Sequence, residues 1–390
     1  MNRRTLRAIV VLALVVEAIN STPIVSAQVR ATSGAQVNQE SPIDFDRARK
    51  LFESRNSGQK LNEEDEAYLR RAMEARRARE NQNRPAGNAQ APKPRDSIGL
   101  KPLSEMTAED RYKEQDGGLY GVGRNEPPKE HYHAAELALA KIKPLDAHGN
   151  PTANGKIAFI SISMSNATQE FSMFKRMADA DNAKSAQVTI VDCAQGGQAM
   201  AEWVPANGSP WSVAKERIAT ANISPQQVQV AWVKLANKGP RGDLAEHGTK
   251  LERDTVIVLQ NAKLRFPNLK IVYLSSRIYG GYATTNLNPE PFAYESAFAA
   301  RWLIQSQIKG DAGLNFNEDK GPVKAPLLLW GPYLWADGTT PRTEDNLAYK
   351  REDLAADGTH PSEAGREKVA KLILHFFKTD PLAKTWFTLK

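Results

Sequence analysis

Five short apolar runs, separated by stretches with helical spacing, constrain the fold of this chain more than any other feature. They show no alternation with polar residues, which is typical of strands buried on both faces of a parallel sheet. The runs are KIAFISI (156–162), QVTIVDC (187–193), QVQVAWVKL (227–235), LKIVYLS (269–275) and APLLLWG (325–331). The helical stretches are 168–180, 211–221, 243–265, 291–308 and 361–377. This order predicts a three-layer α/β/α sandwich around a five-stranded parallel sheet.

The first part of the chain lacks this alternation. Helical spacing broken by a turn at Asn56 to Gly58 predicts a small helical hairpin, and the Pro, Asn, Gln and Gly content that follows it is typical of a linker. The predicted segments are a disordered stretch at 28–43, the hairpin at 44–79, the linker at 80–97, a lead-in at 98–155 and the main domain at 156–390.

The chain begins MNRRTLRAIVVLALVVEAINSTPIVSAQ, with a basic start, an apolar run and then small residues. This pattern predicts a signal peptide over residues 1–27, with cleavage before Gln28 and export to the periplasm or beyond. The apolar run at 8–16 is too short to span a bilayer, so no integral membrane segment is expected after the signal is removed.

Composition narrows the classes of function. At 390 residues and 41% hydrophobic, the chain can bury a full core. The net charge of +7 comes with scattered basic residues, many of them near the start of the chain, so we expect no nucleic-acid partner. The single cysteine, Cys193, excludes an intramolecular disulfide, and its apolar setting predicts a small buried residue and not a nucleophile.

Polar residues and glycines follow three successive predicted strands. Ser163 and Ser165 follow the first strand, Gly197 the second and Asn237 the third. Each has an ordinary structural explanation, because serine and asparagine form caps and turns and glycine forms tight turns. Since the carboxyl ends of parallel strands meet at one edge, these residues are also expected to lie close together.

The segment DGTHPSEAG precedes the last predicted helix. Pro361 suits the first helical position, which makes His360 the cap, yet histidine caps poorly. Asp357 lies three residues before it. A serine hydroxyl needs a base to take its proton, the base needs an orienting carboxylate, and the oxyanion needs donors. Asp357 and His360, together with the groups at the strand ends, can supply these parts.

In these four blocks the sequence resembles the SGNH (GDSL-type) hydrolases, over roughly 156–378. The resemblance implies a flavodoxin-like sheet and an exported, bacterial-type serine esterase without a cofactor. It implies roles for five residues: Ser165 as nucleophile, Gly197 and Asn237 in the oxyanion hole, and Asp357 and His360 as the rest of the triad.

The sequence departs from the family pattern at three places. Ser163 and Met164 precede Ser165 where the family usually has Gly-Asp, and the alternative alignment makes Ser163 the nucleophile. Leu235 replaces a usual glycine, and Asp192 replaces a common asparagine. The missing Gly-Asp motivates a second hypothesis, a carbohydrate- or ligand-binding protein on a degenerate scaffold.

A third hypothesis makes Asp357 and His360 metal ligands, together with His131, His133 or His247, but these histidines lack recognisable metal spacing.

Residues in the longer loops suggest the substrate. Arg277 suits a carboxylate on the substrate, or an ion pair with a nearby Asp or Glu. Flat aromatic rings suit sugar faces, although each ring can equally serve to pack its own loop. The rings are those of Trp203, Trp211, Tyr279, Tyr282, Trp330, Tyr333 and Trp335. We therefore expect a small-molecule or glycan ester, with O-acyl groups on a carbohydrate or a similar polar molecule. The oligomeric state is not predicted.

Overall fold

The computed structural model describes residues 43–56, 61–82 and 92–389. The predicted signal peptide (1–27) and the predicted disordered stretch (28–43), apart from Ile43, lie outside the described residues. So does the part of the predicted linker at 83–91.

The main domain contains one parallel sheet of five strands in the order β2-β1-β3-β4-β5. The strands are β1 (Ile157–Ile162), β2 (Val188–Val191), β3 (Val228–Lys234), β4 (Ile271–Ser275) and β5 (Leu327–Trp330). Each lies within a predicted apolar run, and this strand order is the flavodoxin-like one. The predicted three-layer α/β/α fold is confirmed.

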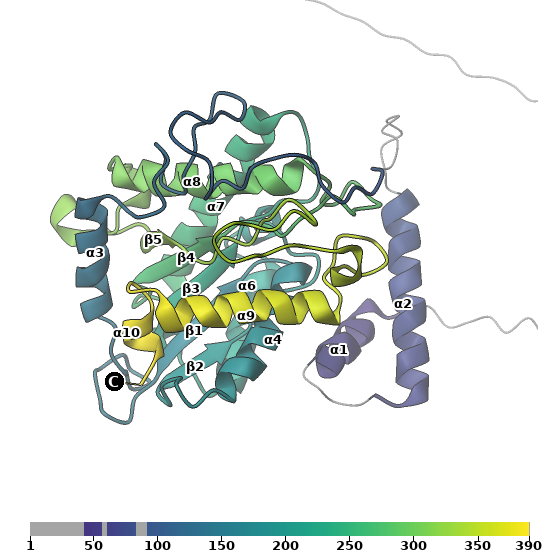
Figure 1. Cartoon of the computed structure of the whole chain (residues 1–390). Coiled ribbons are helices and arrows are strands. Elements are labelled where there is room, and N and C mark those ends of the chain that lie inside the picture. Colours follow the sequence, from purple (N-terminus) through teal and green to yellow (C-terminus); the bar gives the residue numbers. More distant parts are fainter. Residues whose placement is uncertain (1–42, 57–60, 83–91, 390) are drawn as a thin grey trace, which may run out of the picture.

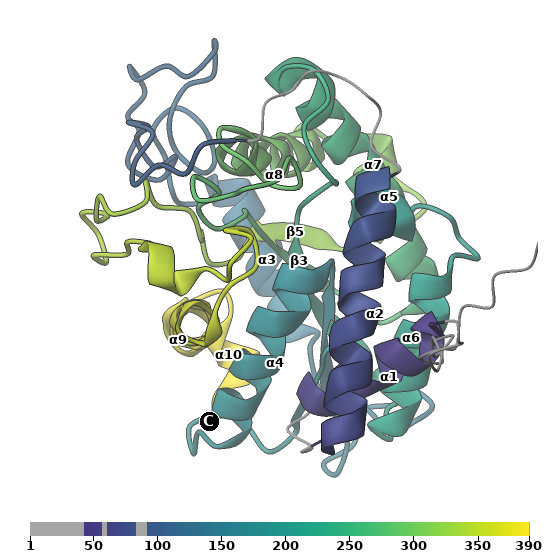
Figure 2. The same ribbon diagram turned by 90° about the vertical axis from the view of Figure 1, so that its right-hand side faces the viewer.

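Helices cover both faces of the sheet (Figures 1 and 2). Two helices, α4 (Ser165–Asp179) and α9 (Glu363–Thr379), pack against each other on one face. The other face carries α6 (Ser209–Thr220), α7 (Leu244–Arg265) and α8 (Phe292–Ile308). The remaining α-helices after residue 92 are α3 (Lys129–Ala140), α5 (Met200–Trp203) and α10 (Lys384–Phe387).

Aromatic packing fixes α4 and α9 on the sheet. Phe171 of α4 stacks on Trp232 of β3, with ring centroids 5.5 Å apart. Phe377 of α9 meets Phe159 of β1 edge-to-face at 4.7 Å. All four rings are fully buried. Because large buried aromatic rings contribute strongly to packing energy, the start of α4 and the segment before α9 are held at fixed positions over the sheet edge.

The amino-terminal hairpin forms from α1 (Phe45–Asn56) and α2 (Glu63–Gln82), so its second helix runs past the predicted end at 79. It buries a small cluster of its own around Ala48, Leu69 and Ala72. Figures 1 and 2 show α2 on the side of the domain where α9 begins. Within the described residues, no helix combines the length and hydropathy needed to cross a bilayer.

Candidate active site

Ser165 is the first residue of α4, directly beyond the carboxyl end of β1. Met164 occupies the N-cap position and provides no side-chain cap, and the helix begins three residues before its expected start at 168. Ser165 Oγ lies 2.8 Å from Nε2 of His360. A helix start leaves backbone N–H groups unpaired, which places partial positive charge beside this hydroxyl.

Ser163 is in a different position. Its side chain is fully buried, and its hydroxyl donates a hydrogen bond of 2.5 Å to the backbone carbonyl of Lys234. Of the two candidate serines, only Ser165 contacts the histidine.

Asp357 holds His360 from one short turn away. Asp357 Oδ2 lies 2.6 Å from His360 Nδ1, and Oδ1 accepts the backbone N–H groups of Thr359 and His360, each at 3.0 Å. Partial burial opposes ionisation of Asp357, but the hydrogen bond and charge of His360 keep the pKa of the carboxyl well below its usual range. A carboxylate only accepts, so Nδ1 carries the proton and Nε2 is free to accept the Ser165 hydroxyl.

Two details of DGTHPSEAG explain how His360 is placed, and the second corrects the expected helix start. Gly358 has a φ of 62°, and a Cβ atom there would lie 1.7 Å from the carbonyl oxygen of Tyr282, so only glycine fits between the two loops. The cap of α9 is Ser362, whose hydroxyl accepts the N–H of Gly365. His360 is therefore not the cap, and its imidazole is free to face Ser165.

Gly197 and Asn237 lie in the loops after β2 and β3. Asn237 Oδ1 accepts the N–H of Ala201 at 2.9 Å, and Asn237 Nδ2 donates to Asp254 Oδ2 at 2.9 Å. A donor on one side and an acceptor on the other fix the amide orientation, and one Nδ2 hydrogen stays available. Gly197 has a φ of 77°, and no described group accepts its N–H or that of Ser165.

Hydrogen bonds tie these loops together. The N–H of Gln195 and the indole of Trp203 both donate to the carbonyl of Ser163, at 2.9 and 3.3 Å. The N–H of Met200 donates to the carbonyl of Ala236 at 2.8 Å. The loops after β1, β2 and β3 therefore form one connected edge.

The two other departures from the family pattern have structural explanations. Asp192 accepts hydrogen bonds from three hydroxyls, those of Ser161, Thr168 and Ser172, and so ties β1 and α4 to the end of β2. Leu235 is fully buried, and its N–H donates to the carbonyl of Ser275 at 3.0 Å.

A buried ion pair beside the site was not predicted from the sequence. Lys234 Nζ lies 2.6 and 2.5 Å from the two carboxylate oxygens of Glu170, and both side chains are fully buried. Burial lowers the pKa of Lys234 to about 8 although Glu170 opposes this. The only sequence signal was a lysine at the end of a largely apolar strand.

Arg277 is 3% exposed, and its backbone N–H donates to Ser296 Oγ at 3.1 Å. Its Nε is buried without a partner, and no described group accepts a hydrogen bond from the rest of the guanidinium. Burial lowers the pKa of Arg277 to about 10, so the side chain is a cation at neutral pH.

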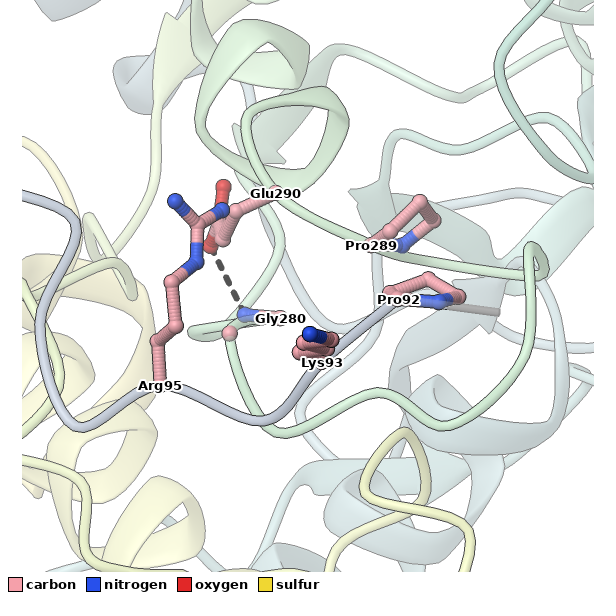
Figure 3. Close-up of a pocket in the computed structure, with 7 residues that line it drawn as sticks. Pro92, Lys93, Arg95, Gly280, Pro289 and Glu290 are labelled. Atoms are coloured by element: carbon pink, nitrogen blue, oxygen red, sulfur yellow. Dashed lines mark hydrogen bonds between the residues drawn. The ribbon is translucent and has the colours of Figure 1, made fainter. Parts of the chain in front are cut away.

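Tyr279 and Trp335 are fully buried, so the expectation that their rings face a substrate is wrong. Tyr279 donates its hydroxyl hydrogen to the carbonyl of Arg95, and the indole N–H of Trp335 donates to Glu290 at 2.8 Å. Figure 3 shows Glu290 bonded to the N–H of Gly280, beside a hollow of about 420 Å³. These residues anchor the loop after β4 and do not form a sugar platform.

The remaining candidates lie elsewhere. Cys193 is fully buried, as predicted, and burial raises the pKa of its thiol. His131 contacts the carbonyl of Leu328, His247 pairs with Glu295, and His133 is exposed. In the part of the chain that the structure describes, no group of three or more His, Cys, Asp or Glu side chains could hold a metal ion.

The chain matches no known family profile and no curated protein sequence. Among solved structures, it resembles a "putative acylhydrolase" from Bacteroides fragilis (14% identity, TM-score 0.34, 67% of this chain and 100% of that one). It also resembles a protein from Arabidopsis thaliana (14% identity, TM-score 0.30, 56% of this chain and 66% of that one). A third is the periplasmic domain of a lipopolysaccharide acetyltransferase from Salmonella ser. Paratyphi A (13%, 0.30, 63% and 95%). Similarity this low carries no argument about the site.

Proposed function

We propose that this protein is a serine hydrolase that cleaves acyl esters, with Ser165 as nucleophile, His360 as general base and Asp357 as the residue that orients the imidazole. One observation carries the proposal: a continuous hydrogen-bonded chain runs from Ser165 Oγ to His360, at 2.8 Å, and on to Asp357, at 2.6 Å. This order of nucleophile, base and orienting carboxylate is what acyl transfer requires.

The reaction has two halves. In the first, Ser165 Oγ attacks the ester carbonyl carbon while its proton passes to His360 Nε2. The tetrahedral oxyanion collapses, the alcohol leaves with that proton, and an acyl-serine ester remains. In the second half, water gives a proton to Nε2 and attacks the acyl carbon. Collapse of this second oxyanion breaks the bond to Ser165 Oγ, which takes the proton back from Nε2, so the carboxylic acid is released and both Ser165 and His360 are restored.

The oxyanion needs donors in both halves. We assign this role to the N–H groups of Ser165 and Gly197 and to the free Nδ2 hydrogen of Asn237. A single donor of this kind contributes about 10²- to 10³-fold in kcat.

The carbohydrate part of the expected substrate loses its main support, because the aromatic rings on which it rested are buried. Trp203 and Trp211 pack edge-to-face with centroids 4.8 Å apart, and Tyr279, Tyr282 and Trp335 are also buried. We therefore propose the ester chemistry without assigning a sugar. The alternative of a non-catalytic binding protein is not favoured, because Ser165, His360 and Asp357 are hydrogen-bonded in the order that catalysis needs, in spite of the missing Gly-Asp.

Hydrolysis of 4-nitrophenyl acetate tests the proposal. We expect His360→Ala to lower kcat by about 10³-fold or more, because the serine then has no base. A fluorophosphonate probe followed by peptide mapping should label Ser165. Ser163→Ala is the matched control: it removes a hydroxyl two residues away and should keep kcat within about threefold. Labelling of Ser163, or no His360-dependent turnover of any acyl ester, would refute the assignment.

Export is a separate proposal. We propose that residues 1–27 direct the protein out of the cytoplasm and are removed before Gln28, because they carry a basic start, an apolar run and a small-residue site. Amino-terminal sequencing of the protein recovered from the periplasm or medium of an expressing bacterium should begin at Gln28. Recovery of only uncleaved protein inside the cells would contradict it.

A further inference from the structure

Arg277 has a charge that nothing in the described structure neutralises at hydrogen-bond distance. It is 3% exposed, and its Nε is buried without a hydrogen-bond partner. A buried cation without a partner is unfavourable, and buried charges are normally paired. The arrangement is therefore typical of a side chain whose partner arrives with a ligand.

Arg277 lies at the same edge of the sheet as the nucleophile. Ile162 of β1, Val233 of β3 and Leu274 of β4 form one row across the sheet. Ser165 and Arg277 each come three residues after that row, two strands apart. Neighbouring strands lie about 4.8 Å apart, so the two positions start about 10 Å from each other, a distance that a long side chain and a small ester can bridge.

The carboxylates whose charges act on Arg277 are those of Glu170 and Glu290. Both already have other partners. The two oxygens of Glu170 bind Lys234. Those of Glu290 accept the N–H groups of Gly280 and Tyr294 and the indole N–H of Trp335. Neither forms an ion pair with Arg277, so the guanidinium keeps its donors for another acceptor.

Further unpartnered polar atoms lie in the loop after β4, which carries Arg277, and in the segment before α9, which carries His360. Both amide atoms of Asn288 and the hydroxyl of Thr359 are buried without a hydrogen-bond partner. The loops touch, because the N–H of Thr284 donates to the carbonyl of Asp357 at 3.1 Å. Buried polar atoms without partners are rare, so a polar ligand bound at this edge would supply the partners that these side chains lack.

We propose that Arg277 binds a carboxylate on the substrate, so that the protein acts on esters that carry a negative charge near the scissile bond. This inference rests on the proposed esterase function. The guanidinium donates two parallel hydrogen bonds to the carboxylate and thereby positions the ester carbonyl at Ser165 Oγ.

Two small esters that differ in one group test the inference: acetoxyacetate, with a carboxylate, and acetoxyacetamide, with a neutral amide. The kcat/KM of each ester is divided by that ester's own rate of hydroxide-catalysed hydrolysis. The corrected value for acetoxyacetate is then divided by the corrected value for acetoxyacetamide, which gives one ratio for each protein variant. We expect the wild type to favour the carboxylate by about tenfold to a hundredfold, which is the range for a hydrogen-bonded charge pair. Arg277→Met should bring the ratio close to one.

The ratio is taken within one variant, so a general loss of activity cancels. Arg277→Lys should keep part of the preference, since it retains the charge but not the planar fork. Arg241→Met, which removes an exposed arginine from the loop after β3, is the matched control and should keep the full ratio. If Arg277→Met fails to fold, the inference is tested by the ratio in the wild type and by the smaller ratio expected in Arg277→Lys.

A wild-type ratio near one, or an unchanged ratio in Arg277→Met, overturns the inference. Calorimetric titration of the Ser165→Ala variant with glycolate and with glycolamide separates it from the proposed function, because binding needs no turnover. Arg277-dependent preference for glycolate, without ester hydrolysis by the wild type, would retain the anion site and refute the esterase. Ester hydrolysis without any preference for glycolate would retain the esterase and refute the anion site.

Discussion

Ser165 and His360 lie 195 positions apart in the chain, yet their Oγ and Nε2 atoms are 2.8 Å apart. The contact exists because α4 begins at Ser165, α9 follows His360, and the two helices pack against each other on one face of the sheet. The Phe171–Trp232 and Phe159–Phe377 contacts hold those helices in place. The geometry of the site therefore depends on the core beneath it.

Asp357→Asn should lower kcat by about 10³- to 10⁴-fold. The asparagine carbonyl can still accept the backbone N–H groups of Thr359 and His360, which turns its NH₂ group toward His360 Nδ1. The imidazole then places its proton on Nε2, facing Ser165, and cannot act as a base. Steady-state hydrolysis of 4-nitrophenyl acetate measures the effect.

The fold should tolerate this change, because both backbone hydrogen bonds survive. Thermal unfolding followed by circular dichroism serves as the control. A kcat within tenfold of wild type, in a variant that unfolds at the wild-type temperature, would show that Asp357 does not set the tautomer.

Asp254→Ala should lower kcat with little effect on KM. Asp254 fixes the amide of Asn237, and without it the Nδ2 group is free to turn away from the oxyanion. The loss in kcat should be smaller than the drop of roughly 10²- to 10³-fold expected for Asn237→Ala, which removes an oxyanion donor outright. Asp254→Asn keeps an acceptor at the same place and should restore most of the activity. Equal losses in Asp254→Ala and Asp254→Asn would argue against this positioning role.

The sheet and the edge at which the candidate site residues lie could be predicted because they depend on local patterns. Continuous apolar runs give buried parallel strands, and the carboxyl ends of such strands share one edge. Ser165, Gly197, Asn237 and the Asp357–His360 pair could therefore be placed together without knowing any side-chain direction.

The side-chain directions in the loops after β4 and β5 could not be predicted from such patterns. Periodicity says nothing about which way a loop side chain points, so Tyr279 and Trp335 were expected to face a ligand when they pack inward. The anchor is Glu290, whose role depends on contacts from three separate positions. The Lys234–Glu170 pair escaped prediction for the same reason, since its partners lie 64 residues apart.

Glu290 should make stability depend on pH. Burial raises its pKa to about 7 although three donors contact the carboxylate. Between about pH 4.5 and pH 7 the folded protein keeps a proton that the unfolded chain has lost, so stability falls as pH rises, by up to about 3 kcal/mol. Urea unfolding across this range should show the slope in the wild type.

Glu290→Gln should remove that slope. The amide oxygen still accepts the N–H of Gly280 and the indole of Trp335, but Tyr294 loses its acceptor, which costs about 1–3 kcal/mol. The variant should therefore be less stable than wild type at pH 5, and the difference should shrink or reverse by pH 8. A constant difference over this range would mean that Glu290 does not titrate there.

The Glu170–Lys234 pair should behave as one unit. Lys234→Met alone leaves a buried carboxylate without its partner and should cost about 3–5 kcal/mol in the free energy of unfolding. Glu170→Gln alone leaves the buried ammonium of Lys234 without its charged partner in the same way. The double variant carries no unpaired charge, so its loss should be smaller than the sum of the single losses by about 1–3 kcal/mol.

Urea unfolding of the four proteins at one pH measures this coupling. The cycle also bears on Arg277, because Glu170 is one of the two carboxylates whose charges act on that side chain. If Glu170 is occupied by Lys234, then Lys234→Met frees it to pair with Arg277, and the preference for acetoxyacetate over acetoxyacetamide should fall. Additive losses together with an unchanged preference would mean that Glu170 and Lys234 act independently and that Arg277 is not affected by either.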